Sequence, residues 1–268
     1  MTNRHHFSDD SSLKGQHYFC MPKIITEAEF NAREEHIVNA ASQVIKEQGF
    51  AALTMDKVVS KVPYAKGSVY KHFNSIEEIL LAISNSGAHH LISLLERARN
   101  YSGNSRQRYL ARAQAYFLYS QLHPVEFICE LDAISPAVLE KASERHRTEG
   151  QLILNRFYKL SAEFVEQGVL EGTLVLPADI SARRVAKTSW SMEFGVSSYA
   201  IAASFGAKRD AKTDALKLQQ DLCWMVNVFL DGLNWQPITE NKDVWSQWCN
   251  IRHTVFNNEF EQLGLLAD

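Results

Sequence analysis

The spacing of apolar residues limits most strongly what this chain can fold into. Between residues 33 and 48, apolar side chains occupy the positions Ile37, Ala40, Ala41, Val44 and Ile45. This spacing is the period of an α-helix that buries one face. Similar stripes recur to the end of the chain, while the alternation of a β-strand is nowhere sustained and no internal repeat occurs. We therefore predict an all-α protein.

Turn and capping residues divide the first part of the chain into helices. Gly49 follows the first stripe and is a typical helix stop. Thr54 can cap a short second helix, which Pro63 ends because the residue before a proline avoids helical backbone. A third short helix follows the proline, and the pair Ser75 and Glu78 predicts a capping box that opens a long fourth helix.

The rest of the chain alternates helical stripes with short breaks. Ser135 and Pro136 predict the start of a helix that runs towards Gly168. A loop around Gly172 precedes a helix rich in small residues, 180–205, and two further apolar stripes follow. We expect a flexible extension in residues 1–28 and a helix-turn-helix domain of three helices in residues 29–75. A larger helical domain follows in residues 76–268.

Composition excludes several classes of protein. No apolar run is long enough to span a bilayer, and residues 1–20 lack the apolar core of a secretion signal. We therefore expect a cytoplasmic protein without membrane contact. The 4 cysteines are far apart and form no CxxC motif, which indicates reduced thiols and neither a disulfide nor a metal site.

Charge is distributed unevenly along the chain. The net charge of -3 does not by itself indicate a nucleic-acid partner. Residues 57–72, however, contain Lys57, Lys61, Lys66 and Lys71 and no acidic residue, so a polyanion would meet this segment. A solvated helix face rich in lysine is the alternative. Two short helices joined by a tight turn fit a helix-turn-helix, whose second helix enters the major groove of DNA.

The same segment resembles a known DNA-binding signature. The features are Gly49-Phe50, then Thr54, then the run Lys66-Gly67-Ser68-Val69-Tyr70-Lys71-His72-Phe73. Over residues 33–85 this pattern resembles the TetR family almost position for position. The resemblance implies a homodimeric transcriptional regulator, by default a repressor, that binds a near-palindromic operator in double-stranded DNA and is released by a small apolar or amphipathic effector.

The resemblance also implies roles for individual residues. Thr54 would contact a phosphate, Gly67 would allow close approach to the groove, and the N-terminal turn of the recognition helix would reach base edges. Tyr70, Lys71 and His72 would grip the DNA backbone, although Tyr70 and His72 could instead belong to the core. The predicted DNA-binding set is Thr54, Tyr64, Ala65, Lys66, Gly67, Ser68, Tyr70, Lys71 and His72. The chain departs from the family pattern at Pro63, Ala65 and Ile76, which puts one or two phosphate contacts in doubt.

The larger domain would carry the dimer face and the effector pocket. Small residues allow close approach of helices, and apolar residues supply contact, so we expect the dimer face at Ser189, Ser191, Gly195, Ser197, Ser198, Ala202, Ala203, Leu222, Val226, Phe229 and Leu233. Pockets are mostly apolar. The predicted lining is Tyr116, Phe117, Phe127, Cys129, Phe157, Trp190, Met192 and Phe194. A plain helical core is the alternative for both sets.

Two other classes of function remain to be weighed. The sequence has no GxSxG, HExxH, phosphate-binding GxxxxGK or GxGxxG motif, and the adjacent His89 and His90 diverge on a helix and cannot easily share a metal. We therefore expect no enzyme activity, no cofactor and no metal. The remaining competitor is an architectural or nucleoid-associated DNA-binding protein that acts without an effector.

Overall fold

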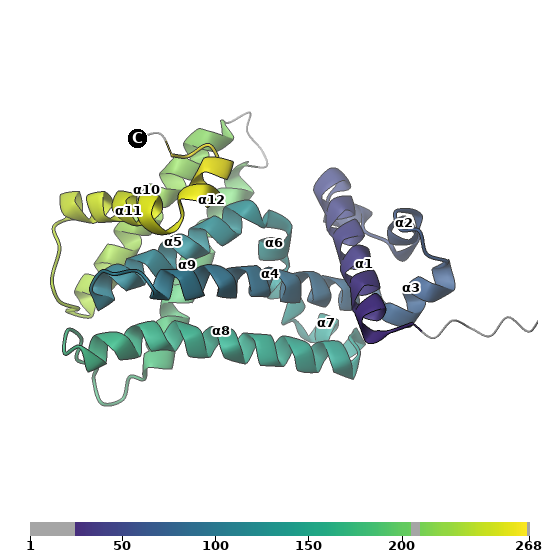
Figure 1. Ribbon diagram of the computed structural model, residues 1–268, viewed down its shortest axis with the longest axis horizontal. Coiled ribbons are helices and arrows are strands. Elements are labelled where there is room, and N and C mark those ends of the chain that lie inside the picture. Colours follow the sequence, from purple (N-terminus) through teal and green to yellow (C-terminus); the bar gives the residue numbers. More distant parts are fainter. Residues whose placement is uncertain (1–24, 205–209, 267–268) are drawn as a thin grey trace, which may run out of the picture.

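The computed structural model describes residues 25–204 and 210–266, and these residues form helices and no strand (Figure 1). The predicted extension therefore lies almost wholly outside the described residues, as does Phe205. The elements are α1 Glu27–Gln48, the 3-10 turn η1 Phe50–Ala52, α2 Met55–Ser60, α3 Lys66–His72, α4 Ile76–Arg99, α5 Ser105–Leu122, α6 Pro124–Ala133, α7 Pro136–Lys141, α8 Glu144–Leu170, α9 Ala182–Ser204, α10 Ala211–Gly232, α11 Asn241–Val255 and α12 Asn257–Gln262. The all-α prediction is confirmed.

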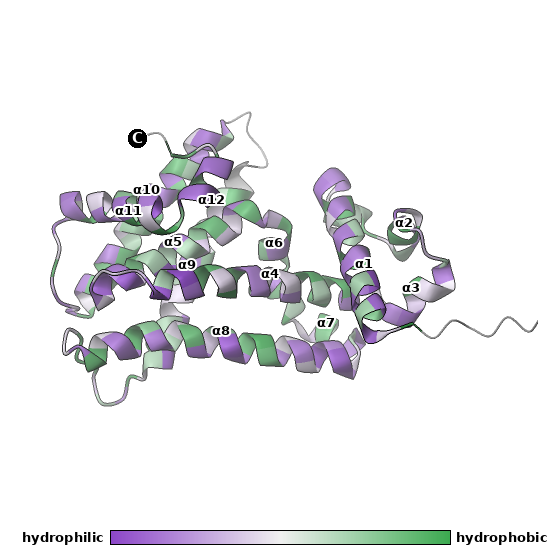
Figure 2. Cartoon of the chain, viewed as in Figure 1, coloured by the Kyte–Doolittle hydropathy of each residue, from purple (hydrophilic) through white to green (hydrophobic). Residues whose placement is uncertain are grey.

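The first three helices form a small unit at one end of the molecule (Figure 1). Ile37, Val44, Val58, Val69 and Phe73 share one buried cluster, so α1 holds α2 and α3 through apolar contact. The first turns of α4 and part of α6 join the same cluster. The two predicted domains are therefore in direct contact. In Figure 2 the face of α1 turned to the viewer is mostly hydrophilic, as expected for an amphipathic helix.

Helix α5 lies at the centre of the larger domain. It packs against α4, α6, α8, α9, α10, α11 and α12, and most of its residues are buried. Its buried charges are paired, because burying an unpaired charge is costly. Arg112 donates to Glu193 over 2.7 Å, and Arg106 donates to the Trp235 carbonyl and to Asp231, over 2.6 Å in each case.

The capping box predicted at the start of α4 is only half formed. The Ser75 hydroxyl accepts from the Glu78 amide over 3.1 Å, as predicted. The Glu78 carboxylate does not return to the Ser75 amide but accepts from the Asn74 amide and from residues of the larger domain. Glu78 is fully buried. The hydrogen bond from the distant Ser143 amide takes the place of the local hydrogen bond to the Ser75 amide that a capping box requires.

The helix predicted from Ser135 to Gly168 is interrupted. Ser135 caps α7 as expected, but α7 ends at Lys141 and Ser143 then caps α8 by accepting from the His146 amide. The final stripe is likewise divided into α11 and α12 at Phe256. Periodicity misses such breaks because the apolar spacing continues across them. No helix in the described ranges is long and apolar enough to cross a membrane.

Candidate nucleic-acid interface

Helices α2 and α3 are joined by a short turn and lie on the side of α1 away from the larger domain (Figure 1). Val69 and Phe73 are fully buried, so they fix α3 to α1 and α2 by its inner face. The remaining face of α3 is open. This is the arrangement that the helix-turn-helix prediction requires, since the second helix must be able to enter a groove.

The open face of α3 carries basic and aromatic side chains. Lys66, Tyr70 and Lys71 are exposed there, together with Ala65 and Gly67. A Cβ atom added to Gly67 would meet nothing within 4 Å, so another surface can approach the backbone closely at this point. The Lys66 ammonium lies 5.8 Å from the centre of the Tyr70 ring. The structure thus brings five of the predicted residues together on one surface.

Lys66 is paired within the protein. Its Nζ donates to Asp56 on α2 over 2.7 Å, and this hydrogen bond raises the pKa of Lys66 above its ordinary value. Both side chains are mostly exposed, with 61% and 79% of their surface accessible. Exposed ion pairs contribute little stability, so a DNA acceptor can take the place of Asp56 at low cost.

Thr54 and Ser68 also lie at the predicted positions. Thr54 is exposed, and its hydroxyl accepts from the Lys57 amide over 3.3 Å, which caps α2 as predicted. Ser68 is half-buried in the first turn of α3. Ala65 occupies the N-cap position of α3 and makes no side-chain hydrogen bond there, because alanine has no capping oxygen.

Tyr64 and His72 point elsewhere. The Tyr64 hydroxyl lies 3.2 Å from Nδ1 of His36, so this half-buried ring is held against α1. His72 is 5% exposed, stacks on Phe30 and has its Nδ1 3.4 Å from Glu34. Burial lowers the pKa of His72 despite the nearby carboxylate. The expectation that His72 grips the DNA backbone conflicts with this position, and the core alternative describes its surroundings.

Comparison with known proteins identifies the helix-turn-helix. Residues 37–83 match the sequence model described as bacterial regulatory proteins, tetR family. The chain carries a TetR-family helix-turn-helix domain. The HTH-type transcriptional activator FasR of Mycolicibacterium smegmatis is 31% identical over 85 residues, which cover 32% of this chain. This chain matches only 39% of the length of FasR.

Solved structures share the fold over about three quarters of this chain. A regulatory protein in the tetR family from Rhodococcus RHA1 matches with a TM-score of 0.55 and 20% identity over 75% of this chain and 96% of that protein. The transcriptional regulator FadR from Bacillus subtilis, solved in complex with stearoyl-CoA, matches with a TM-score of 0.54 and 15% identity over 74% of this chain and 98% of that protein. At this level of identity the likeness concerns the fold.

The larger domain contains a cavity of about 210 Å³ between α4, α6, α7, α8 and α9. Of the predicted lining, only Phe157 and Trp190 reach it. Tyr116, Phe127 and Phe194 belong to the aromatic core behind it. Phe117 stacks on Phe260, Cys129 lies in the cluster of the first three helices, and Met192 is on the surface.

Polar residues that sequence analysis missed also line this cavity. Asn85 on α4, Glu130 on α6 and Arg147 on α8 face it from three helices. Burial raises the pKa of Glu130 to about 8, because desolvation outweighs the hydrogen bond from the Tyr116 hydroxyl. A glutamate at an inward position of an apolar helix was the available sequence signal, but periodicity alone does not distinguish it from a surface residue.

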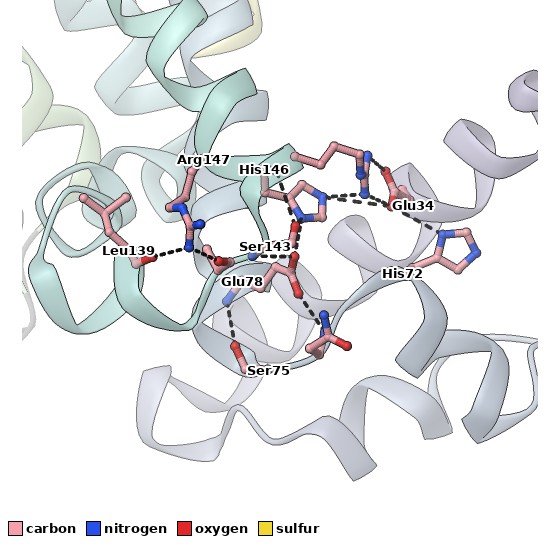
Figure 3. A network of polar contacts seen from close by, with 11 residues as sticks. Glu34, His72, Ser75, Glu78, Leu139, Ser143, His146 and Arg147 are labelled. Carbon is pink, nitrogen blue, oxygen red and sulfur yellow. Dashed lines mark hydrogen bonds and ion pairs between the residues drawn. The ribbon is translucent and has the colours of Figure 1, made fainter.

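A polar network joins the DNA-binding unit to the larger domain (Figure 3). Glu34 on α1 accepts from both terminal nitrogens of Arg145 on α8, one of them at 2.9 Å. Glu78 on α4 accepts from the Ser143 amide over 3.0 Å and lies 2.6 Å from Nδ1 of His146. The His146 ring stacks on Phe73 from the end of α3, with 5.0 Å between centroids. This network connects α1, α3, α4 and α8.

The predicted dimer face needs correction. Leu222 and Val226 are fully buried inside the protomer, as is Ser197, so they cannot meet a second subunit. Of Ala202 and Ala203 the structure describes no side chain. Other residues of α9 and α10 expose large apolar side chains in the described part of the chain. They are Met192, Tyr199, Leu216, Trp224 and Val228.

Proposed function

We propose that this chain is a DNA-binding transcriptional regulator that reads an operator with the exposed face of α3. The observation that carries the proposal is the grouping of Lys66, Gly67, Tyr70 and Lys71 on a helix whose opposite face is anchored by Val69. In this proposal residues 29–75 are the DNA-binding domain. Lys66 reaches a base edge, and Tyr70 and Lys71 position the helix on the backbone, since backbone contacts set register.

We further propose that residues 76–268 bind a small effector and that its binding releases the protein from DNA. The cavity supports this role, because ligand sites are concave and mostly apolar with a few placed polar groups. FadR of Bacillus subtilis, which shares the fold, was solved with stearoyl-CoA bound. The cavity also favours an effector-responsive regulator over an architectural protein, which needs no such site.

Helices α9 and α10 supply a surface for a homodimer. They pack against each other, and the outward faces expose Tyr199 and Trp224, with 79% and 62% of their surface accessible. Aromatic residues are enriched in interfaces, so this surface supports association of two copies. A two-fold dimer places its two recognition helices on half-sites about one helical turn apart, or a multiple of it.

The decisive experiment is selection of bound sequences from a random DNA library, followed by gel shifts on the selected operator. Lys66→Ala and Tyr70→Ala should each weaken specific binding, Lys66→Ala by about 1–3 kcal/mol if it contacts a base. Lys159→Ala is the matched control, because Lys159 is an exposed lysine on α8. Unchanged affinity in both test variants, or a selected site without two-fold symmetry, would contradict the proposal.

A further inference from the structure

The cavity described above is apolar over most of its wall. Leu81, Leu91, Ile153, Phe157 and Trp190 are among the side chains that line it. An engineered apolar cavity of about 150 Å³ holds benzene. At about 210 Å³ the present cavity is therefore suited to a ligand of roughly ten non-hydrogen atoms. This size restricts the occupant to a small molecule or to one end of a longer one.

One polar group in the wall has no partner. Asn85 is 7% exposed, and its amide nitrogen makes no hydrogen bond. The Asn85 amide packs closely against α8, because a Cβ atom added to Gly150 would lie only 3.0 Å from the amide oxygen. Leaving a buried donor unsatisfied is costly. A ligand that supplies an acceptor would remove this cost, so the wall favours molecules with an acceptor oxygen.

The second polar group in the wall is the carboxyl of Glu130, which can donate a hydrogen bond when it is protonated. Glu130 accepts from the Tyr116 hydroxyl over 3.0 Å, and no described Lys, Arg or His forms an ion pair with it. Its pKa of about 8 leaves most of the carboxyl protonated at neutral pH. Arg147 is the one strong cation that lines the cavity in the described residues, and its Nη1 is bound to the carbonyls of Leu139 and Ala142.

These groups discriminate between ligand charges. A ligand cation would face the amide donor of Asn85 and the guanidinium of Arg147, and it would first have to ionise Glu130. The Nη1 of Arg147, which a ligand carboxylate would pair with, already donates to the carbonyls of Leu139 and Ala142, and desolvating an anion in a largely apolar wall is expensive. A neutral molecule with an acceptor meets neither penalty.

We propose that this cavity takes a neutral, largely apolar molecule whose carbonyl-type oxygen accepts hydrogen bonds from the Asn85 amide and the Glu130 carboxyl. This inference rests on the proposed effector role of the cavity. Asn85 also lines the groove between the two domains, beside Glu34, Arg145 and His146 of the network in Figure 3. A ligand held by Asn85 therefore acts on the same turn of α4 that contacts the DNA-binding unit.

Calorimetric titration with four probes of one carbon framework tests the ligand class. Butyrophenone is the neutral ketone, butylbenzene lacks the oxygen, phenylbutylamine carries a cation and phenylbutyrate carries an anion. At pH 7 the ketone should bind about fivefold to thirtyfold more tightly than butylbenzene, because each of its two hydrogen bonds contributes about fivefold net. Both charged probes should bind more weakly than the hydrocarbon.

Variants assign the effect to the two donors. Asn85→Leu should reduce the advantage of the ketone about fivefold, the net contribution of one hydrogen bond, and leave the affinity for butylbenzene in place, which also shows that the cavity is folded. Glu130→Gln should keep the advantage, because the glutamine amide still donates. Lys159→Ala is the control and should change nothing.

The dependence on pH adds a readout specific to Glu130. A carboxyl donates only when protonated, so wild-type affinity for the ketone should be constant up to about pH 7 and fall as pH rises through about 8. Tyr116 and Tyr119 on α5 and Tyr158 on α8 stay neutral in this range because burial raises the pKa of each, and Arg147 stays charged. The affinity of Glu130→Gln should not change with pH.

Three results would overturn the ligand class: a ketone no tighter than butylbenzene, tightest binding by the amine with proton release, or an unchanged ratio in Asn85→Leu. Gel shifts of the ligand-free protein on its selected operator are run in parallel. Intact DNA binding with any of these results refutes the ligand class alone, whereas loss of operator recognition in the wild type refutes the proposed function.

Discussion

Replacement of Glu78 by alanine should destabilise the protein strongly. The carboxylate accepts hydrogen bonds from the Asn74 amide at 2.7 Å and the Ser143 amide at 3.0 Å, and it contacts Nδ1 of His146 at 2.6 Å. Alanine at this fully buried position removes the acceptor of the Asn74 and Ser143 amides and leaves Nδ1 of His146 with only the Ser143 hydroxyl, at 3.1 Å. Each stranded donor costs about 1–3 kcal/mol, and breaking a buried charged pair costs about 3–5 kcal/mol in measured cases. We expect the free energy of unfolding to fall by about 3–5 kcal/mol.

The measurement is urea unfolding followed by far-UV circular dichroism. Glu77→Ala is the matched control, because the adjacent Glu77 pairs only with the exposed Lys141 and should change stability by less than about 1 kcal/mol. Glu78→Gln keeps the shape and one acceptor oxygen, so it should lie between the two. A loss below about 1 kcal/mol in Glu78→Ala would refute the assignment of three hydrogen bonds to a single buried carboxylate.

Glu78→Ala should also change how the free energy of unfolding depends on pH. Burial alone would raise the pKa of Glu78, but hydrogen bonds from Ser143, Asn74 and His146 outweigh it, and the pKa lies below its ordinary value of 4.5. A carboxyl whose pKa is lowered by folding stabilises the native state above pH 4.5, and this stabilisation is lost as pH falls through the folded pKa. The difference between wild type and Glu78→Ala should therefore shrink below pH 4.5. A constant difference would contradict the role of the ionised carboxylate.

Three further predictions follow from single contacts. Gly168→Ala should lower stability by about 1–3 kcal/mol in urea unfolding, because its Cβ would lie 2.4 Å from the fully buried ring of Trp235; no loss would mean that Trp235 can move. Trp224→Glu should convert a dimer into a monomer in light scattering without changing the circular dichroism spectrum, and an unchanged mass would exclude this face. Thr54→Ala should cost about 1 kcal/mol through loss of the α2 cap, and a cost equal to that of the exposed Lys159→Ala would show that the cap is dispensable.

The helix-turn-helix could be predicted from sequence because its determinants are local. Gly49 has a φ of 82°, a backbone angle that favours glycine, and so it stops α1 where the sequence predicts. Thr54 and Ser75 cap the next helices through neighbouring amides. The anchors Val69 and Phe73 follow from a spacing of four residues on one helix face. None of these features depends on distant parts of the chain.

The pocket and the dimer face could not be predicted in the same way. Leu222 and Val226 lie on the inner face of α10, and Trp224 on its outer face, yet all three are large and apolar. The sequence shows that these three side chains are apolar, but it does not show which face of α10 packs against α5. The break before Ser143 depends on Glu78, which lies 65 residues earlier in the chain. Contacts across such separations are invisible to periodicity.

The ion pair between Lys66 and Asp56 affects how the protein searches DNA. The carboxylate acts as a competitor built into the reading surface, because it holds the lysine that would contact DNA. Displacing it costs about 1 kcal/mol or less, whereas a good base contact returns about 1–3 kcal/mol. Sequence-independent contacts return too little to compensate, so in the proposed function Lys66 stays paired with Asp56 on random DNA. Asp56 therefore lowers operator affinity by about 1 kcal/mol or less and confines the use of Lys66 to sites that offer it a good base contact.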